Sequence, residues 1–140
     1  MPTPSLSFIS RCLLLSALFI HSSYADVGTA AQYGPPFLPT ACFGGDASEF
    51  PSSNMFGAAG EGIWDNGAAC GRLYEVRCIS AAAPRTCIAG QTIQIKIVDR
   101  AVSSRSRPSS DATSMVLSTT AFRAIANSSA SLINIEFQQV

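Results

Sequence analysis

The sequence predicts a single, mainly β domain whose strands each bury one face, as the strands of a small barrel do. Apolar and polar side chains alternate along three segments, residues 73–79, 92–98 and 132–138. The chain of 140 residues has room for one such domain. Its composition, 47% hydrophobic and 13% charged, excludes a disordered chain, and its formal charge of zero argues against nucleic-acid binding.

Residues 1–25 have the features of a secretory signal peptide. Arg11 precedes an apolar run over residues 12–20, and Ala25 supplies a small residue where a signal peptidase cuts. A membrane anchor is the less favoured alternative, because about nine apolar residues are too few for a bilayer that needs roughly 20. We therefore expect residues 26–140 to be exported as the mature domain and not to span a membrane.

The mature domain lacks histidine, because His21 is removed with the signal peptide. This absence excludes Ser-His-Asp and Cys-His catalysis and argues against a zinc site, and we expect no metal or cofactor. An even number of cysteines in an oxidising compartment predicts two disulfides, and the spacing leaves three pairings open. The four cysteines are Cys42, Cys70, Cys78 and Cys87.

Charges are distributed unevenly along the mature domain. Five acidic residues and no basic residue lie between Asp26 and Cys70, whereas eight bases and four acids follow from Gly71 onward. Two solvated faces are the favoured interpretation. The alternative is a basic surface that binds an acidic polymer such as pectin.

Residues 26–69 are rich in Gly, Pro, Ala and Phe and show little periodicity. The prolines at 35–36 interrupt regular structure early. A short helix is expected over residues 53–59, with Asn54 as its N-cap. The sequence at 65–67, Asp-Asn-Gly, predicts a turn.

A helix is predicted between the second and third of the three alternating segments. Ser118 is its expected N-cap, Leu117 and Phe122 are suited to form a hydrophobic staple, and Asn127 is expected to end it. Residues 101–114 are rich in serine and lack periodicity, which predicts an exposed loop.

Residues 64–78 contain the sequence W-D-N-G-A-A-C-G-R-L-Y-E-V-R-C. This segment resembles the first domain of expansins, in which the pattern W/F-x-N-G-x-x-C-G-x-x-Y-x-V-x-C is typical. Three further segments match in the family's order: residues 28–33, residues 93–100 ending in Val-Asp-Arg, and residues 117–122 with Leu-Ser-x-x-Ala-Phe. The match extends over essentially all of residues 26–140.

Within this group the chain is most similar to the single-domain EG45-like domain proteins, also called plant natriuretic peptides or blight-associated p12-like proteins. The resemblance implies a six-stranded double-psi β-barrel with one or two short helices. It also implies the disulfides Cys42–Cys70 and Cys78–Cys87. The second, polysaccharide-binding domain of true expansins is expected to be missing.

The chain departs from the family pattern at two cysteine positions just after the matching segment of residues 93–100. Ala101 stands where the family usually has a cysteine after Val-Asp-Arg, and a nearby cysteine is also missing. Leu73 occupies a position where true expansins have a cysteine. We therefore expect the loop over residues 101–114 to be less restrained than in relatives.

Inverting hydrolysis of a glycosidic bond needs two carboxyl groups, one to donate a proton and one to activate water. In family 45 endoglucanases, which share the implied fold, the acid directly precedes the Leu-Ser of the helix start. Val116 has that position here and cannot donate a proton. Asp111 lies in the preceding loop, and productive geometry must be tightly held, so rescue by Asp111 is not expected. We therefore predict no catalytic residue.

Asp99 matches the strand-end carboxylate of the family. A structural role is favoured, because an Asp at a strand end often accepts hydrogen bonds from backbone amides or pairs with a base such as Arg100. The alternative is a polar floor for a sugar-binding groove, or a vestige of one. Ala31, where the family often has Thr, removes another polar residue from that groove.

Tyr33 and Trp64 complete the candidate groove with Asp99, because aromatic rings stack on sugars. A single Trp in a small domain belongs more often to the core, which is the favoured interpretation for Trp64. For Tyr33 the core and the groove are about equally supported.

Asn127 begins the sequence Asn-Ser-Ser, an acceptor for N-glycosylation at the expected end of the helix. The motif is short and occurs often by chance.

The resemblance implies a secreted, non-catalytic protein of the apoplast, an extracellular signal in water and solute homeostasis that acts through a cell-surface receptor. One alternative is an expansin-like module that binds cell-wall polysaccharide without hydrolysis. A stress- or defence-related protein is another, although near-neutral charge argues against direct attack on membranes. A monomer that binds no nucleic acid is expected.

Overall fold

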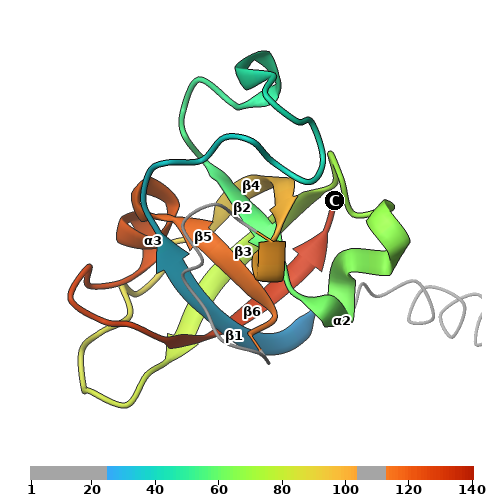
Figure 1. The fold of residues 1–140 in the computed structure, drawn as a ribbon. Coiled ribbons are helices and arrows are strands. Elements are labelled where there is room, and N and C mark those ends of the chain that lie inside the picture. Colours follow the sequence, from blue (N-terminus) through green and yellow to red (C-terminus); the bar gives the residue numbers. More distant parts are fainter. Residues whose placement is uncertain (1–24, 104–112) are drawn as a thin grey trace, which may run out of the picture.

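The computed structural model describes residues 25–103 and 113–140, and the six strands in these ranges close into a barrel (Figure 1). The strands are β1 (Asp26–Tyr33), β2 (Phe56–Ala59), β3 (Leu73–Ser80), β4 (Ile93–Arg100), β5 (Met115–Ser118) and β6 (Ile133–Gln139). The helices are α2 (Glu61–Trp64) and α3 (Thr119–Ile125), with 3₁₀ turns η1 (Ala47–Glu49), η2 (Asp65–Gly67) and η3 (Ala101–Ser103).

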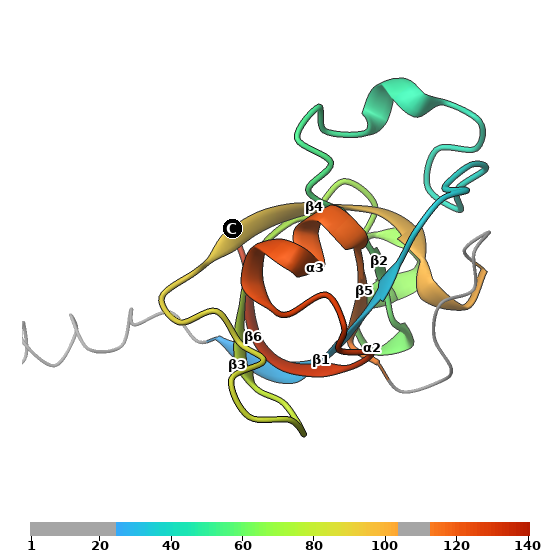
Figure 2. The same cartoon turned by 90° about the vertical axis from the view of Figure 1, so that its left-hand side faces the viewer.

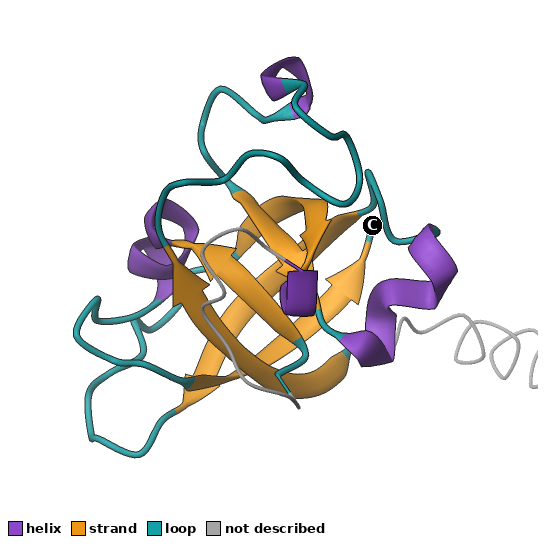
Figure 3. Cartoon of the chain, viewed as in Figure 1, coloured by secondary structure: helices purple, strands orange, loops and turns teal. Residues whose placement is uncertain are grey.

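The strands follow one another around the barrel in the order β1-β5-β2-β4-β3-β6, and β6 closes on β1. Two pairs, β1 with β5 and β2 with β4, are parallel, and the other pairs are antiparallel. Parallel neighbours need long connections, so each parallel pair joins segments that are distant in the sequence. Figure 3 shows how the loops gather outside the strands.

The interior of the barrel is filled by the apolar positions of the alternating strands. Ile95 and Ile97 of β4 face the same interior cluster as Ile133 and Ile135 of β6. Helix α3 lies across one open end of the ring of strands (Figure 2). Its Phe122 is fully buried in the same cluster, so the helix closes that end of the core.

The structure confirms the three alternating strands, with boundaries shifted by one or two residues. It also confirms the N-cap of α3, where the hydroxyl of Ser118 accepts a hydrogen bond from the backbone N–H of Ala121 at 3.2 Å. Leu117 and Phe122 are both buried, as a hydrophobic staple requires. The helix ends at Ile125, before the expected Asn127.

The helix expected over residues 53–59 is wrong, because residues 56–59 form strand β2. β2 pairs on both sides, with β4 and with β5, and all four of its residues are buried. Its small side chains permit this close packing: a Cβ added to Gly57 would lie 2.8 Å from the backbone oxygen of Val116. Asn54, the expected cap, instead has a φ of 62°. Pairing with two neighbours therefore overrides the local helical preference.

A second apolar cluster lies on the outer side of the barrel wall, beneath the loop of residues 34–55. We call it the outer cluster; its buried residues are Ala31, Tyr33, Phe56, Ala58, Val98, Ala101 and Val116. The loop, which runs outside the ring of strands in Figure 2, packs Phe37, Phe43 and Phe50 against it. The outer cluster is therefore covered by the protein's own chain.

Two disulfides reinforce the described part of the fold. Cys42–Cys70 fastens the covering loop to the segment before β3, with the two Cα atoms 5.4 Å apart. Cys78–Cys87 closes the loop after β3, with Cα atoms 5.3 Å apart. These are the two pairs that the resemblance implies. In the described ranges no helix has the length and apolar character needed to cross a membrane.

Candidate functional site

Asp99, near the end of β4, is fully buried beside the outer cluster. Its Oδ1 accepts two backbone hydrogen bonds, from the N–H of Ala41 at 2.8 Å and from the N–H of Arg100 at 2.8 Å. The first bond joins the covering loop to the barrel wall, and the second stabilises the strand end. The geometry matches the structural role that local sequence favours for a strand-end Asp.

The other oxygen of Asp99 and the hydroxyl of Tyr33 are both buried, and neither has a hydrogen-bond partner among the described residues. Burial raises the pKa of Asp99, although the two backbone hydrogen bonds oppose this rise. Burial, and secondarily the charge of Asp99, raises the pKa of Tyr33. The two side chains therefore form a polar spot enclosed by apolar residues, where a charge on Asp99 is costly.

Val116 lies on β5 in the wall beside this polar spot and is 0% exposed. It pairs with Ala31 of β1 and with Ala58 of β2, both in the outer cluster. The position that the resemblance gives to a proton donor is thus aliphatic and enclosed. Within residues 25–103 and 113–140, Asp99 is the only buried acidic residue. Asp111 lies outside the described residues.

Trp64, at the end of α2, is half-buried and packs against the interior cluster rather than the outer one. The guanidinium of Arg100 lies 5.6 Å from the ring of Trp64. The same guanidinium makes two 2.8 Å hydrogen bonds to the carboxylate of Glu61, which lowers the pKa of Glu61. Arg100 thus occupies one face of the only Trp in the sequence.

The structure does not bring the three groove candidates together on one open surface. Tyr33 is 3% exposed and Asp99 is 0% exposed, and both lie under the covering loop. Trp64 lies against a different cluster. Asn127, by contrast, is exposed in the turn after α3.

Sequence reasoning missed the contacts that hold the covering loop in place. Nζ of Lys96 on β4 binds the backbone oxygen of Glu49 at 2.9 Å and its carboxylate at 3.1 Å. The same ammonium lies 5.3 Å from the ring centre of Phe43. At the end of the loop, the hydroxyl of Ser118 donates to the backbone oxygen of Asn54 at 2.6 Å. The alternating pattern places Lys96 on the polar face of its strand, but it does not indicate which residues the side chain contacts, because these partners are distant in sequence.

Ion pairs join the acidic first part of the chain to its basic second part. The pairs at this junction are Asp65–Arg72 at 2.7 Å, Glu49–Lys96 at 3.1 Å and Glu61–Arg100 at 2.8 Å. Arg77 pairs in addition with Glu136. Four of the eight bases are thus paired with acids of this chain, which weakens the case for a basic surface around them; Arg105 and Arg107 lie outside the described residues.

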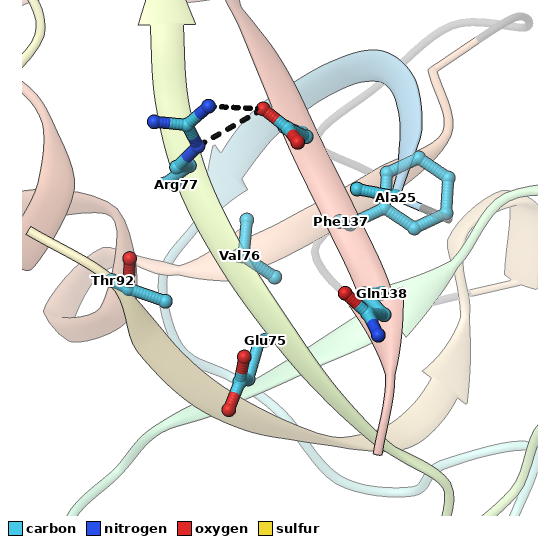
Figure 4. Close-up of a pocket in the computed structure, with 8 residues that line it drawn as sticks. Ala25, Glu75, Val76, Arg77, Thr92, Phe137 and Gln138 are labelled. Carbon is cyan, nitrogen blue, oxygen red and sulfur yellow. Dashed lines mark hydrogen bonds and ion pairs between the residues drawn. The ribbon is translucent and has the colours of Figure 1, made fainter. Parts of the chain in front are cut away.

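A shallow pocket of about 200 Å³ lies over β3 and β6, on the opposite wall of the barrel from the outer cluster (Figure 4). The ion pair of Arg77 and Glu136 forms one side of it, and Glu75 and Gln138 line it further. None of the sequence-predicted site residues lines this pocket. In the part of the chain that the structure describes, no three His, Cys, Asp or Glu side chains are grouped to hold a metal ion.

The sequence of this chain is similar to those of several known proteins. A family model described as lytic transglycolase matches residues 57–137. An EG45-like domain containing protein of Citrus jambhiri is 37% identical over 131 residues, which cover 91% of this chain and 88% of that protein. EG45-like domain containing protein 2 of Arabidopsis thaliana is 30% identical over 138 residues, which cover 97% of each chain.

Solved structures of an expansin from Clavibacter michiganensis have the same fold. The apo form superposes with a TM-score of 0.59, at 21% identity, over 84% of this chain and 50% of that one. A mutant of that expansin in complex with cellohexaose gives a TM-score of 0.61 with the same identity and coverage. At this identity the likeness concerns the fold, and with the family match it confirms the predicted double-psi β-barrel.

Proposed function

Because this chain belongs to the family of EG45-like domain containing proteins, we propose that it is an exported, non-hydrolytic protein that acts by binding. The observation that carries the proposal is the enclosure of Asp99. It is the only buried acid in the described ranges, and it lies under the loop of residues 34–55. The aliphatic Val116 has the position at which the resemblance implies a proton donor.

The description of the matching family model names an enzyme class that cleaves glycosidic bonds. Such cleavage needs an acid within hydrogen-bond reach of the scissile oxygen. One oxygen of Asp99 holds two backbone amides, and the other is sealed from solvent. A polysaccharide chain has no path to either oxygen while the covering loop is in place, which supports a role without hydrolysis.

The finer proposal is an extracellular signal in water and solute homeostasis that acts in the apoplast through a cell-surface receptor. Two features support it: the signal-like residues 1–25 and a folded domain whose outer cluster is covered by its own loop. A protein of this kind presents its exposed surface, rather than a cleft, to a partner.

Protoplast swelling tests this role directly. Purified residues 26–140 added to plant protoplasts should cause a dose-dependent change in volume. Protein whose two disulfides have been reduced and alkylated serves as a control for loss of the fold. An unchanged volume with the folded protein at all doses would overturn the signalling role.

A second candidate, binding of cell-wall polysaccharide without hydrolysis, is favoured by one observation: a structurally similar expansin is found in complex with cellohexaose. Against it, Tyr33 and Asp99 are enclosed and Arg100 covers one face of Trp64. Co-sedimentation with insoluble cellulose and with pectin separates the two functions. The signalling role predicts that the protein stays in the supernatant, and retention on either polymer supports the second candidate.

A further inference from the structure

The turn after α3 carries a motif that the proposed function does not use. Asn127, Ser128 and Ser129 form an Asn-x-Ser sequence, the acceptor for N-linked glycans, and no other Asn in the sequence is followed by this pattern. All three residues are exposed. We propose that Asn127 carries an N-linked glycan, an inference that rests on the proposed export because the glycan donor is met on the secretory route.

The side chain of Asn127 is held by the residue that completes the motif. Its Oδ1 accepts a hydrogen bond from the backbone N–H of Ser129 at 3.0 Å and another from the Ser129 hydroxyl at 2.9 Å. Both bonds engage the carboxamide oxygen, whereas the glycan attaches to the carboxamide nitrogen. Hydrogen bonds to the oxygen draw electrons from the nitrogen and make its proton easier to remove.

The backbone around Asn127 is fixed independently of the side chain. The N–H of Asn127 donates to the backbone oxygen of Thr86 at 2.8 Å. The side-chain amide of Gln32 donates to the backbone oxygens of Ser128 and Ala130, each at 2.9 Å. The turn is thus anchored through its main chain, and its side chains face outward. A glycan on Nδ2 of Asn127 displaces no packed group, so the modified chain can keep this fold.

The modification is a group transfer from a lipid-linked oligosaccharyl diphosphate. A bond forms between Nδ2 of Asn127 and the anomeric carbon of the first sugar, and the bond from that carbon to the diphosphate oxygen breaks. Nδ2 loses one proton, the lipid diphosphate leaves, and nothing is oxidised or reduced.

The test expresses the full chain in cultured plant cells and analyses protein from the medium before and after treatment with peptide N-glycosidase A. Wild type and Ser129→Thr, which preserves the motif, should show a mobility shift that the enzyme removes. Asn127→Gln and Ser129→Ala should show none. Ser128→Ala is the matched control, because it alters the exposed middle position of the motif and should retain the shift.

The outcomes distinguish failure of the proposed glycosylation of Asn127 from failure of the proposed export. Wild-type protein that is exported without a glycan on the peptide containing Asn127 overturns this inference and leaves the proposed export standing. Absence of the protein from the medium overturns both. A shift that persists in Asn127→Gln also overturns the inference. If Asn127→Gln is not recovered, the comparison of Ser129→Ala with Ser128→Ala gives the answer.

Discussion

The carboxylate of Asp99 on β4 accepts a hydrogen bond from the backbone N–H of Ala41, 2.8 Å away in the loop that covers the outer cluster. The next residue in that loop, Cys42, is bonded to Cys70. A polar group at the end of a core strand and a disulfide therefore fasten the same stretch of loop. The residue that the resemblance places in a sugar-binding groove here acts as an anchor beneath the protein's own chain.

Replacing Asp99 separates its hydrogen bonds from its charge. Asp99→Ala leaves the N–H groups of Ala41 and Arg100 without their acceptor, which should lower the free energy of unfolding by about 1–3 kcal/mol. Asp99→Asn retains an acceptor oxygen and should lose clearly less. Urea denaturation followed by tryptophan fluorescence measures both values. Equal losses in the two variants would show that the backbone hydrogen bonds contribute nothing.

The stability contributed by Asp99 should depend on pH in a defined direction. Burial raises the pKa of Asp99 in the folded state above its usual 3.8, so the folded protein keeps this proton at pH values where the unfolded chain has lost it. This contribution is greatest below pH 3.8 and is lost as the pH rises through the raised value.

Asp99→Asn removes this titration and leaves those of other residues in place, so the comparison isolates Asp99. The unfolding free energy of wild type minus that of the variant should fall across this window and level off above it. Urea denaturation at a series of pH values measures the difference. A difference that rises with pH would contradict the assignment.

The two disulfides should contribute unequally to stability. Cys42–Cys70 spans a sequence separation of 28 and Cys78–Cys87 a separation of 9. Loop-closure entropy predicts that removal of the longer cross-link, as a double Ser variant, costs about 1 kcal/mol more than removal of the shorter one. Urea denaturation of the two double variants tests the ranking. A larger loss for the 78–87 pair would contradict it.

The contact between Arg100 and Trp64 can be followed by fluorescence, because Trp64 is the only tryptophan. Arg100→Gln removes the cation from the ring and should shift the emission of Trp64 with a stability change of no more than about 1 kcal/mol. Arg77→Gln, which removes the ion pair with Glu136 on β3 and β6, is the control and should leave the emission unchanged. Identical spectra for wild type and Arg100→Gln would refute the contact.

The sequence predicts those strands of this fold along which apolar and polar residues alternate. Ile93, Ile95 and Ile97 point to one side of a strand, and the structure buries the last two completely. The residues of β2, at 56–59, escaped the same reasoning because Phe-Gly-Ala-Ala has no alternation and is buried on both faces. The six-stranded closed barrel was expected from the resemblance alone, because parallel pairs of distant segments leave no local signal, and the strand order is known only from the structure.

The enclosure of the candidate site was not predictable in the same way. Tyr33 and Asp99 are distant in sequence, and the burial of both depends on where the loop of residues 34–55 settles. That loop has no period, and its anchors are single contacts such as Lys96 with Glu49. By contrast, the cap at Ser118 depends on neighbouring residues alone and was predictable.

The most direct test of a non-hydrolytic protein is the release of reducing sugar from cellulose and xyloglucan by purified residues 26–140, measured beside Asp99→Asn and Asp111→Asn. The enclosure of Asp99 and the aliphatic side chain of Val116 predict release no greater than that of a protein-free blank. Turnover by the wild type that either substitution abolishes would contradict the account.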